Sequence, residues 1–245
     1  MGQTGSFRQS EILGHKHTIL STAWLPEAQI LQLEQAGIYC EQIPFISIQQ
    51  SVTDEVRGVI DIAAQQQKVV VFTSANAVAP VVAALAGKAP DWQIFCISGA
   101  TRAAAEQYFG ADKIAGSADD AASLEQKISL QEPVSEVLFF CGNKRLDTLP
   151  DLLLRRGISV KEYRVYTTTL TPLKIDTSYE AILFFSPSGV ESFLSENEIA
   201  QDTVLFSIGH TTAKALRSSL PNEVIVSPEP GKKQLTETVI AYYKA

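Results

Sequence analysis

The amino-acid sequence predicts two doubly wound α/β domains, each built on a parallel sheet of about five strands with helices on both faces. Short apolar segments typical of strands alternate with helix-like segments along the 245 residues, and such alternation indicates parallel sheets. The order of these segments also occurs twice along the chain. A content of 45% hydrophobic and 19% charged residues is typical of a globular protein, and the length suffices for one large or two small domains.

The charge and cysteine content exclude several classes of protein. The formal net charge is −7 and no basic run is present, so nucleic acid, which is bound mainly through Lys and Arg, is not an expected partner. Cys40, Cys96 and Cys141 form neither a CxxC pair nor an even set, which indicates a reducing compartment. The N-terminus lacks the apolar stretch of a signal peptide, and the uncharged run 69–87 changes from a strand-like to a helix-like pattern. We therefore expect a cytoplasmic protein that does not contact membranes.

A long segment of the chain is duplicated. Residues 70–128 and 182–243 share one order of signals: an apolar strand that ends at a serine, a helix, an apolar strand followed by Gly-x-Thr, a second helix, a short strand and a last helix. In the second copy the Gly-x-Thr motif is extended to Gly-x-Thr-Thr, at residues 209–212. Each copy therefore predicts a set of strands that alternate with helices.

A shorter duplication precedes each copy of the long segment, at residues 18–48 and 137–168. Both copies read as a strand, a polar turn, a helix and a second strand, and the helix is followed by Gly37 in the first and Gly157 in the second. Glycine just past a helix end supplies a left-handed conformation that most residues resist. The helix of the second copy shows an apolar stripe at helical spacing, formed by Leu146, Leu149 and Leu153.

The pattern of elements leaves two domain arrangements open. In a tandem arrangement, each short segment joins the long segment that follows it. In an interleaved arrangement, the first short segment joins the last long segment, so that the middle of the chain forms one domain and its two ends form the other. The chain then crosses twice, near residues 44–54 and 163–176, and these segments are strand-like or polar enough to pair as a two-stranded ladder.

The predicted strand ends carry small, hydroxylated or glycine residues. In an open parallel sheet, the carboxyl ends of the strands and the N-termini of the following helices lie at one edge, where backbone N–H groups meet anionic ligands. Ser, Thr and Asn at such positions commonly do no more than cap helices. Their presence at several ends, in duplicate, favours a ligand site that is rich in donors and poor in fixed charge. These ends are residues 73–74, 98–101, 142–145, 186–189 and 209–212.

Two adjacent cations, Lys144 and Arg145, are an exception, because they follow a predicted strand in an acidic protein. They either occupy a solvated helix start or attract carboxylates, with which Arg forms bidentate pairs. Tyr166 lies in the strand-like segment of the second crossing. Its hydroxyl serves either as a structural hydrogen-bonding group or as a phenol presented to a ligand.

Standard catalytic signatures are absent from the sequence. It holds no G-x-G-x-x-G after a strand, no G-x-x-x-x-G-K-[ST] and no G-x-S-x-G, which disfavours a Rossmann dehydrogenase, a P-loop NTPase and an α/β-hydrolase. His15 and His17 lack the nearby ligands that a metal site needs. His210, at a predicted strand end, is read as a neighbour of a helix cap rather than as a base.

Five blocks of the sequence, taken in order, resemble those of the uroporphyrinogen III synthase family. They are FTSANAV, GATRAAA, FFCGNKR with the following GISVKEYRVYTT, FFSPSGVESF and SIGHTTAKAL, and the resemblance covers about residues 17–243. The chain departs from the family pattern at Ala23-Trp24, where many members have Arg-Pro. This departure puts an N-terminal arginine contact in doubt.

The resemblance implies an α/β fold of two flavodoxin-like domains in the interleaved arrangement, joined by a two-stranded β-ladder. One domain is then discontinuous, with residues 17–43 and 177–245, and the other spans 55–160. Residues 44–54 and 161–176 form the linkers between the domains, and residues 1–16 form a flexible N-terminal arm.

The resemblance also implies an activity in haem biosynthesis: the linear tetrapyrrole hydroxymethylbilane is cyclised to uroporphyrinogen III, with inversion of ring D and loss of water. No metal or organic cofactor is implied. The expected partner is this small molecule, with a monomeric protein that contacts the preceding pathway enzyme transiently. Because hydroxymethylbilane closes spontaneously to the symmetrical isomer, the protein's task is orientation more than strong acid–base chemistry.

Roles for individual residues follow from the resemblance. Tyr166 matches a family tyrosine that assists departure of the hydroxyl group, and is the expected catalytic residue. Positions that line the family's substrate cleft are matched by Thr73, Ser74, Thr101, Ser186, Ser188, Thr211 and Thr212. The same strand ends add Gly142, Asn143 and Gly189 as expected substrate-binding residues. Cations that offset the substrate's negative charge are Lys144, Arg145 and Lys214.

Two other interpretations of the sequence are kept beside the synthase. One is a non-catalytic two-domain module that binds a small anion or acts as a sensor, which predicts anion binding without turnover. The other is a synthase-like protein that has lost activity, which the Ala23-Trp24 departure permits.

Overall fold

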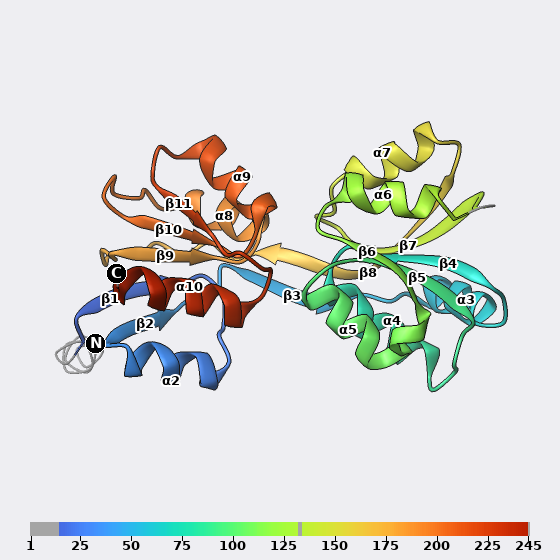
Figure 1. The fold of residues 1–245 in the computed structure, drawn as a ribbon, viewed down its shortest axis with the longest axis horizontal. Coiled ribbons are helices and arrows are strands. Elements are labelled where there is room, and N and C mark those ends of the chain that lie inside the picture. Colours follow the sequence, from blue (N-terminus) through green and yellow to red (C-terminus); the bar gives the residue numbers. More distant parts are fainter. Residues whose placement is uncertain (1–14, 132–133, 245) are drawn as a thin grey trace. The chain divides into compact units, whose positions relative to one another are not determined.

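The structure is a computed structural model that describes residues 15–131 and 134–244, and the chain forms two compact units (Figure 1). Unit 1 contains the described residues up to Ser47 and from Thr169 onward, and unit 2 contains Ile48–Thr168. The middle of the chain therefore forms one unit and its two ends form the other. The N-terminal arm expected at residues 1–16 falls almost entirely outside the described residues.

Unit 1 is built on a five-stranded sheet in the order β11-β10-β9-β1-β2, and all its pairings are parallel. Counted within the unit, this is the order 5-4-3-1-2, which is the flavodoxin-like topology read from the opposite edge. The switch point lies between β1 and β9. The strands are β1 (His17–Ser21), β2 (Ile38–Gln42), β9 (Ala181–Phe184), β10 (Val204–Ser207) and β11 (Val224–Val226).

Helices cover both faces of the unit 1 sheet, as Figure 1 shows. Ile19 of β1 packs in one buried cluster with Leu33 and Leu235, which belong to helices on one face. The next residue, Leu20, packs in a second cluster with helices on the other face. This alternation along a strand explains why its whole sequence is apolar. The helices on the first face are α2 (Glu27–Gln35) and α10 (Lys232–Lys244), and those on the second are α8 (Pro187–Leu194) and α9 (His210–Ser219).

Unit 2 contains a six-stranded sheet in the order β3-β8-β7-β4-β5-β6. Without β3 this is the same flavodoxin-like topology, in which β7 takes the place of the first strand and lies beside β4. The pairing of β4 with β7, and of β1 with β9, excludes the tandem arrangement. The strands are β3 (Ile46–Gln50), β4 (Lys68–Phe72), β5 (Trp92–Ile97), β6 (Ile114–Ala118), β7 (Glu136–Gly142) and β8 (Ser159–Leu170).

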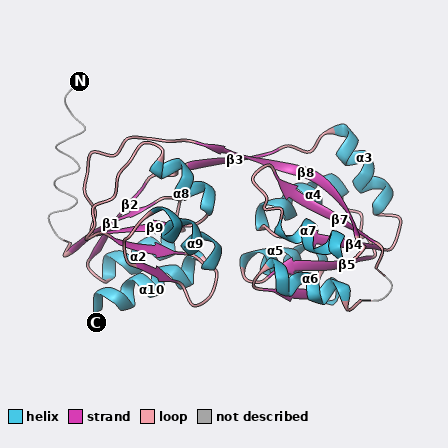
Figure 2. Cartoon of the chain, turned by 90° about the horizontal axis from the view of Figure 1, so that it is seen from above, coloured by secondary structure: helices cyan, strands magenta, loops and turns pink. Residues whose placement is uncertain are grey.

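The unit 2 sheet is also covered on both faces, and Figure 2 shows helices flanking its strands. Val70 and Phe72 of β4 pack against helices on one face, while Val71 between them packs against helices on the other. The first set is α3 (Asp54–Ala63), α4 (Val78–Leu85) and α5 (Ala100–Phe109), and the second is α6 (Ala121–Ser129) and α7 (Thr148–Arg155). Two 3₁₀ turns, η1 (Ala75–Ala77) and η2 (Ala111–Lys113), complete the unit.

Strands β3 and β8 lie side by side at the two places where the chain crosses between the units. The Ser51 N–H donates to the Val165 carbonyl oxygen (N···O 2.9 Å), and the Thr171 N–H donates to the Phe45 carbonyl oxygen (3.0 Å). Because the residue number rises along one strand as it falls along its partner, the two strands run antiparallel. The two-stranded ladder implied by the sequence is therefore present.

Matched glycines end the helices of the two short segments. Gly37 follows α2 with φ +77°, and Gly157 follows α7 with φ +80°. Both glycines have the left-handed conformation in which a side chain is strained, as the sequence predicts. The chain thus leaves each helix in the same way and returns to the strand that follows.

Two local features differ from what the sequence pattern predicts. Leu146 does not belong to the apolar stripe with Leu149 and Leu153, because α7 begins at Thr148 and Leu146 is 59% exposed. Helix α3 lies outside both duplications, so neither of them predicts it. Its start is fixed by Thr53, whose hydroxyl accepts a hydrogen bond from the Val56 N–H (3.3 Å).

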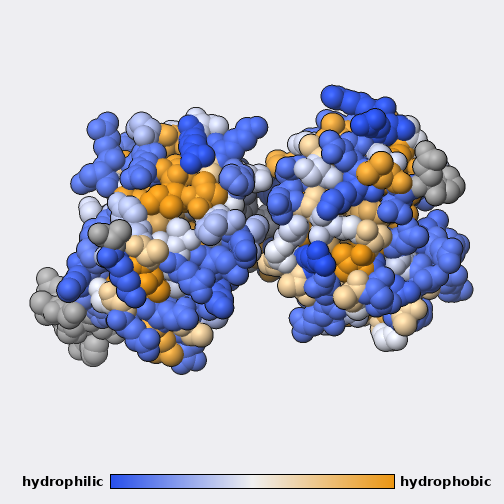
Figure 3. All heavy atoms as spheres, viewed as in Figure 1, coloured by the Kyte–Doolittle hydropathy of each residue, from blue (hydrophilic) through white to orange (hydrophobic). Residues whose placement is uncertain are grey.

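Hydrophilic residues dominate the viewed surface of both units, and apolar residues gather on unit 1 over β10 and β11 (Figure 3). Strand β11 is an edge strand, and its three residues are each half-buried. Within the described ranges, each helix is too short or too polar to cross a membrane.

Candidate active site

The candidate residues of unit 2 lie at the carboxyl edge of its sheet, on both sides of the switch point between β7 and β4. Thr73 and Ser74 follow β4, while Gly142 ends β7 and Asn143 follows it. Parallel pairing of β4 with β7 brings these two strand ends to the same edge. In doubly wound sheets, ligands bind at this position because the chain leaves the two strands toward opposite faces.

Tyr166 reaches this edge through a β-bulge. Strand β8 pairs in regular register with β7 as far as Cys141 and Arg164, and then Gly142 is paired with Tyr166. The bulge breaks the alternation of side chains along β8, so that Val165 and Tyr166 both contact the core cluster beneath α3, α4 and α5. A β-bulge commonly re-aims a side chain in this way next to a functional site.

The ring of Tyr166 lies directly against the backbone of Gly142. A Cβ atom built on Gly142 would lie 2.8 Å from the hydroxyl oxygen of Tyr166 and closer still to Cζ of its ring. These separations are far below any van der Waals contact, so this position requires a residue without a side chain. The ring of Tyr166 therefore packs directly on Gly142, and the sequence did not indicate this role for the glycine.

The hydroxyl of Tyr166 is held next to Ser74. Burial raises the pKa of Tyr166 above its ordinary value, and a hydrogen bond with the Ser74 side chain offsets part of that rise. Ser74 also accepts a hydrogen bond from the Asn76 N–H (3.3 Å) and so caps η1. The phenol is consequently protonated at neutral pH, and it is positioned to donate a hydrogen bond or a proton at the sheet edge.

The side chain of Asn143 is hydrogen-bonded to the protein backbone. Its Oδ1 accepts from the Thr168 N–H (2.7 Å) and its Nδ2 donates to the Thr168 carbonyl oxygen (3.0 Å). The side chain thereby continues the hydrogen bonding between β7 and β8 past the bulge. Asn143 therefore holds the loop on β8, and its expected contact with substrate stays a prediction.

The two cations that follow β7 differ in their surroundings. The Arg145 guanidinium donates through Nε to Glu162 and through an Nη nitrogen to Asp147. Asp147 and Glu162 raise the pKa of Arg145. The expected role of Arg145 in offsetting substrate charge is weakened, because two carboxylates of the same unit already neutralise it. Lys144 is exposed at the same edge.

Thr101 lies in the first turn of α5 and its side chain is only 6% exposed. The hydroxyl is therefore not presented at the surface of the edge. Cys141, which directly precedes Gly142, is also buried, and burial raises the pKa of its thiol to about 11. It behaves as a small apolar residue, as the sequence predicts.

Unit 1 places Ser186, Ser188 and Gly189 at the equivalent edge of its own sheet, after β9. Ser186 caps α8, since its hydroxyl accepts from the Gly189 N–H (3.1 Å), and its Oγ lies 3.1 Å from that of Ser188. Ser186 and Ser188 are half-buried, whereas Gly189 is buried. A Cβ on Gly189 would lie 3.4 Å from the Ser186 oxygen, so a small side chain is accommodated only in tight contact.

The Gly-x-Thr-Thr segment after β10 forms the start of α9. Thr211 and Lys214 are exposed, while Thr212 is 3% exposed and packs into the unit. At the equivalent turn after β5, the buried threonine is Thr101, the second residue of α5. In α9 the buried threonine is the third residue, Thr212. The two turns differ because Gly99 has φ +75° while Gly209 is extended.

Helices α5 and α9 begin directly after a glycine and have no side-chain cap. Gly99 before α5 and Gly209 before α9 carry no side chain to accept from the first N–H groups, whereas η1 and α8 are capped by serines. The first N–H groups of a helix have no partner within the helix, and the helix dipole favours negative charge there. The starts of α5 and α9 therefore suit carboxylate groups.

Sequence reasoning missed two residues at the switch point of unit 1, between β1 and β9. Thr22 is 2% exposed and donates through its hydroxyl to the Leu183 carbonyl oxygen (2.8 Å). Lys232, the first residue of α10, donates to the Trp24 carbonyl oxygen (2.6 Å). The sequence signal for Lys232 is its position after a strand and a glycine, Gly231.

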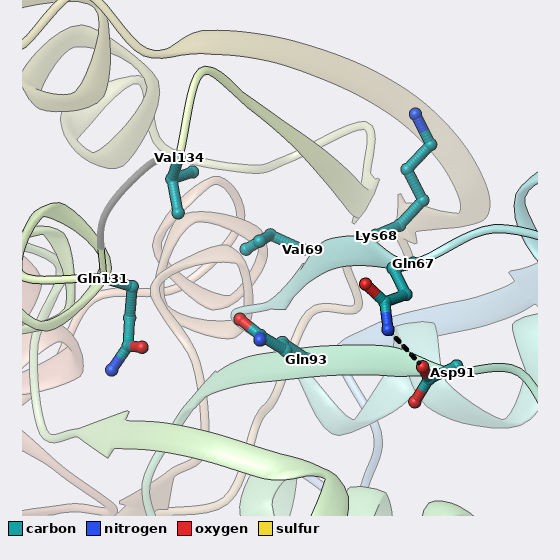
Figure 4. Close-up of a pocket in the computed structure, with 7 residues that line it drawn as sticks. All are labelled: Gln67, Lys68, Val69, Asp91, Gln93, Gln131 and Val134. Carbon is teal, nitrogen blue, oxygen red and sulfur yellow. Dashed lines mark hydrogen bonds between the residues drawn. The ribbon is translucent and has the colours of Figure 1, made fainter.

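Two hollows in the described surface lie at the opposite, amino-terminal edges of the sheets. Helices end there, so the edge is less suited to anions. The hollow of unit 1, about 510 Å³, is lined by Ser178, Tyr179, Glu180, Ala200, Asp202, Thr203, Val204, Tyr242 and Tyr243. The hollow of unit 2, about 320 Å³, is lined by Gln67, Lys68, Val69, Asp91, Gln93, Gln131 and Val134 (Figure 4). Neither contains a candidate residue.

No group of three or more His, Cys, Asp or Glu residues in residues 15–131 and 134–244 has an arrangement that could hold a metal ion. His17 Nδ1 instead lies 2.8 Å from a carboxylate oxygen of Glu180, within hydrogen-bond distance. His210 is the first residue of α9 and is exposed, which agrees with its interpretation as a neighbour of a helix cap.

Comparison with known proteins gives a family and relatives. The profile of the family described as "Uroporphyrinogen-III synthase HemD" matches residues 28–237 of this chain. The uroporphyrinogen-III synthase of Saccharomyces cerevisiae (strain ATCC 204508 / S288c) is 29% identical over 130 residues, which are 46% of this chain and 47% of the yeast protein. The match thus spans about half the length of that curated relative.

Two solved structures share the fold. A mutant uroporphyrinogen III synthase from the extremely thermophilic bacterium Thermus thermophilus has a TM-score of 0.65 at 16% identity, covering 94% of this chain and 100% of that chain. Uroporphyrinogen-III synthetase from Helicobacter pylori 26695 has a TM-score of 0.57 at 17% identity, covering 92% and 99%. The family profile matches most of the sequence, and the same two-domain α/β fold is found in these structures; the chain belongs to the uroporphyrinogen-III synthase family.

Proposed function

We propose that this chain catalyses the cyclisation of hydroxymethylbilane to uroporphyrinogen III, with inversion of ring D and loss of one water. The observation that carries the proposal is the family match over residues 28–237, supported by the protonated phenol of Tyr166 at the switch point of unit 2. Nothing in the comparisons favours the alternative of a non-catalytic anion-binding module.

In the proposed mechanism, Tyr166 assists the departure of the terminal hydroxyl group. The phenol donates its proton to the hydroxyl oxygen, the C–O bond breaks, and the electron pair of the adjacent pyrrole nitrogen forms an azafulvene, with water as the leaving group. The substituted carbon of ring D attacks this electrophile and gives a spiro intermediate. One C–C bond then breaks and ring D closes in the inverted direction. The proton released on rearomatisation balances the one that the phenol supplied.

Substrate binding is proposed to rest on neutral donors more than on fixed charge. The N–H groups at the starts of α5 and α9 meet acetate and propionate groups, and the hydroxyls of Thr73, Ser74, Ser186, Ser188 and Thr211 add further donors. Thr101 and Thr212 contribute through their backbone, because their side chains are buried. Lys144 and Lys214, both exposed, provide positive charge in a protein of net charge −7.

The proposal assigns no step to a metal or an organic cofactor. It places the protein in the cytoplasm as a monomer, with no nucleic-acid or membrane partner. A transient contact with the enzyme that produces hydroxymethylbilane is part of the proposal, because this substrate closes to the symmetrical isomer on its own. Rapid transfer limits that side reaction.

The experiment supplies freshly generated hydroxymethylbilane to the purified protein, oxidises the products and separates the uroporphyrin isomers by chromatography. Predominantly type III product is expected. Type I product alone, formed at the uncatalysed rate, contradicts the proposal and leaves a binding module or an inactive relative.

A further inference from the structure

The ammonium group of Lys232 lies at the switch point of unit 1, where no candidate cation was assigned. Its Nζ donates to the Trp24 carbonyl oxygen (2.6 Å) and lies 6.0 Å from the centre of the Phe185 ring. Trp24 is in the loop that follows β1, and Phe185 directly follows β9. Lys232 is therefore hydrogen-bonded to the loop after β1 and lies over the ring of the residue that follows β9.

The two loops are held together independently of Lys232. The Thr22 N–H donates to the Leu183 carbonyl oxygen (3.0 Å), which extends the pairing of β1 with β9 to the edge of the sheet. Ser186 follows Phe185 and caps α8. The ammonium thus lies against a fixed framework, and the residue after Phe185 is the serine that the proposed function places in substrate binding.

The charge of Lys232 is not neutralised within the described part of the chain. No carboxylate there lies within 4.0 Å of its Nζ, whereas the next residue, Lys233, pairs with Glu237 on the same helix (3.9 Å). An ammonium has three hydrogens, and the Trp24 carbonyl accepts one of them. Lys232 is exposed, so its remaining donors are accessible.

The surroundings of the ammonium favour an anionic ligand. Phe185 presents a ring face at the distance of a weak cation–π contact. The groups packed around the ammonium remove part of its water, and this desolvation lowers the pKa of Lys232. An ion that has already lost part of its hydration interacts more strongly with a counter-ion than one in bulk water.

We propose that Lys232 binds a carboxylate of the tetrapyrrole at the switch point of unit 1 and helps to determine affinity for a substrate that carries acidic side chains. This inference rests on the proposed function, and it adds a binding residue that lies on α10 rather than at a strand end. It assigns no chemical step to Lys232.

The test compares Lys232→Met, which keeps the length of the stem but removes the charge, with Lys232→Arg and with the control Lys233→Met. Anaerobic calorimetry measures the Kd for uroporphyrinogen III at low and at high ionic strength, and thermal unfolding of each variant is recorded. We expect Lys232→Met to raise Kd about fivefold at low ionic strength, with a smaller factor at high ionic strength, while Lys232→Arg and Lys233→Met stay near the wild type.

A role confined to tethering α10 to the Trp24 loop gives a different result. In that case Lys232→Met lowers the melting temperature without changing Kd, and the inference is overturned. Absence of binding by the wild-type protein overturns it as well. Failure of the proposed function is seen separately, as formation of type I product alone by the wild type.

Discussion

The ring of Tyr166 packs against the backbone of Gly142, with so little space that a Cβ on Gly142 would lie 2.8 Å from the phenol oxygen and closer still to the ring. A bulge between Cys141 and Gly142 creates this contact by shifting the register of β7 and β8. The position of the phenol therefore depends on a glycine at the end of one strand and on an extra residue in its neighbour.

Gly142→Ala is expected to displace Tyr166 and to reduce activity. The methyl group overpacks the site, which costs about 1–3 kcal/mol of unfolding free energy, and kcat falls about tenfold or more because the phenol moves. The control is Gly58→Ala, since a Cβ there meets nothing within 4 Å in helix α3. It is expected to raise stability by about 0.5–1 kcal/mol. Wild-type kcat in Gly142→Ala would show that the phenol position is unimportant.

Tyr166→Phe is expected to preserve the fold and to lower kcat. The ring still fills the space above Gly142, and only the proton donor is lost. A positioned general acid typically raises the reaction rate by a factor of about 10² or more. Because this substrate is itself reactive, we expect kcat to fall by about 10², the low end of that range. The control is Tyr163→Phe, on the same strand and in contact with the same core cluster. If both variants keep wild-type steady-state kinetics, Tyr166 has no part in the reaction.

The pH dependence of stability is expected to differ between wild type and Tyr166→Phe. Burial raises the pKa of Tyr166 above its ordinary value of 10.0. The folded state thus disfavours the phenolate, so this group's contribution to stability is complete below about pH 10 and declines as pH rises further. The unfolding free energy, measured with urea at about every pH unit from pH 8 to 11, should fall more steeply with rising pH for the wild type than for the variant. Parallel curves would indicate a solvent-exposed phenol.

Thr212→Met is expected to destabilise the protein by overpacking. Thr212 is 3% exposed, and the longer side chain has no space, so the unfolding free energy should fall by about 1–3 kcal/mol. Thr211→Met is the matched control, because the neighbouring Thr211 is exposed, and its effect should stay within about 0.5 kcal/mol. Equal denaturation midpoints for the two variants would mean that the first turn of α9 packs differently.

Arg145→Met is expected to affect stability slightly and substrate affinity little. The guanidinium already pairs with Glu162 and Asp147, and such partly exposed pairs contribute less than about 1 kcal/mol. Initial rates over a range of hydroxymethylbilane concentrations give KM for the variant. A rise in KM of about tenfold with unchanged stability would show that Arg145 leaves its partners to bind substrate.

The order of elements was predictable from the sequence because it depends on local signals. Apolar runs gave the strands, and Gly37 and Gly157 gave the ends of two helices, where both have positive φ. The choice between tandem and interleaved domains was not available from these signals, since strand pairing is non-local. The observed pairing of β1 with β9 became an expectation only through the resemblance to a family.

Details of the site depend on register and rotation that single residues do not reveal. The bulge at Gly142 reverses the side of the sheet that Tyr166 faces, and no residue in the segment RVYTT predicts this bulge. The turns at Gly99 and Gly209 look alike in sequence but bury different threonines, because their backbone angles differ. Leu146 has helical spacing but precedes the helix. Lys232 was missed because its partners, Trp24 and Phe185, are distant in sequence.

The fraction of type III isomer, measured as the protein is titrated into a fixed supply of freshly generated hydroxymethylbilane, tests the central claim most directly. We predict that this fraction rises with protein concentration until type III predominates. A product that stays type I at every protein concentration would contradict the assignment of synthase activity to this chain.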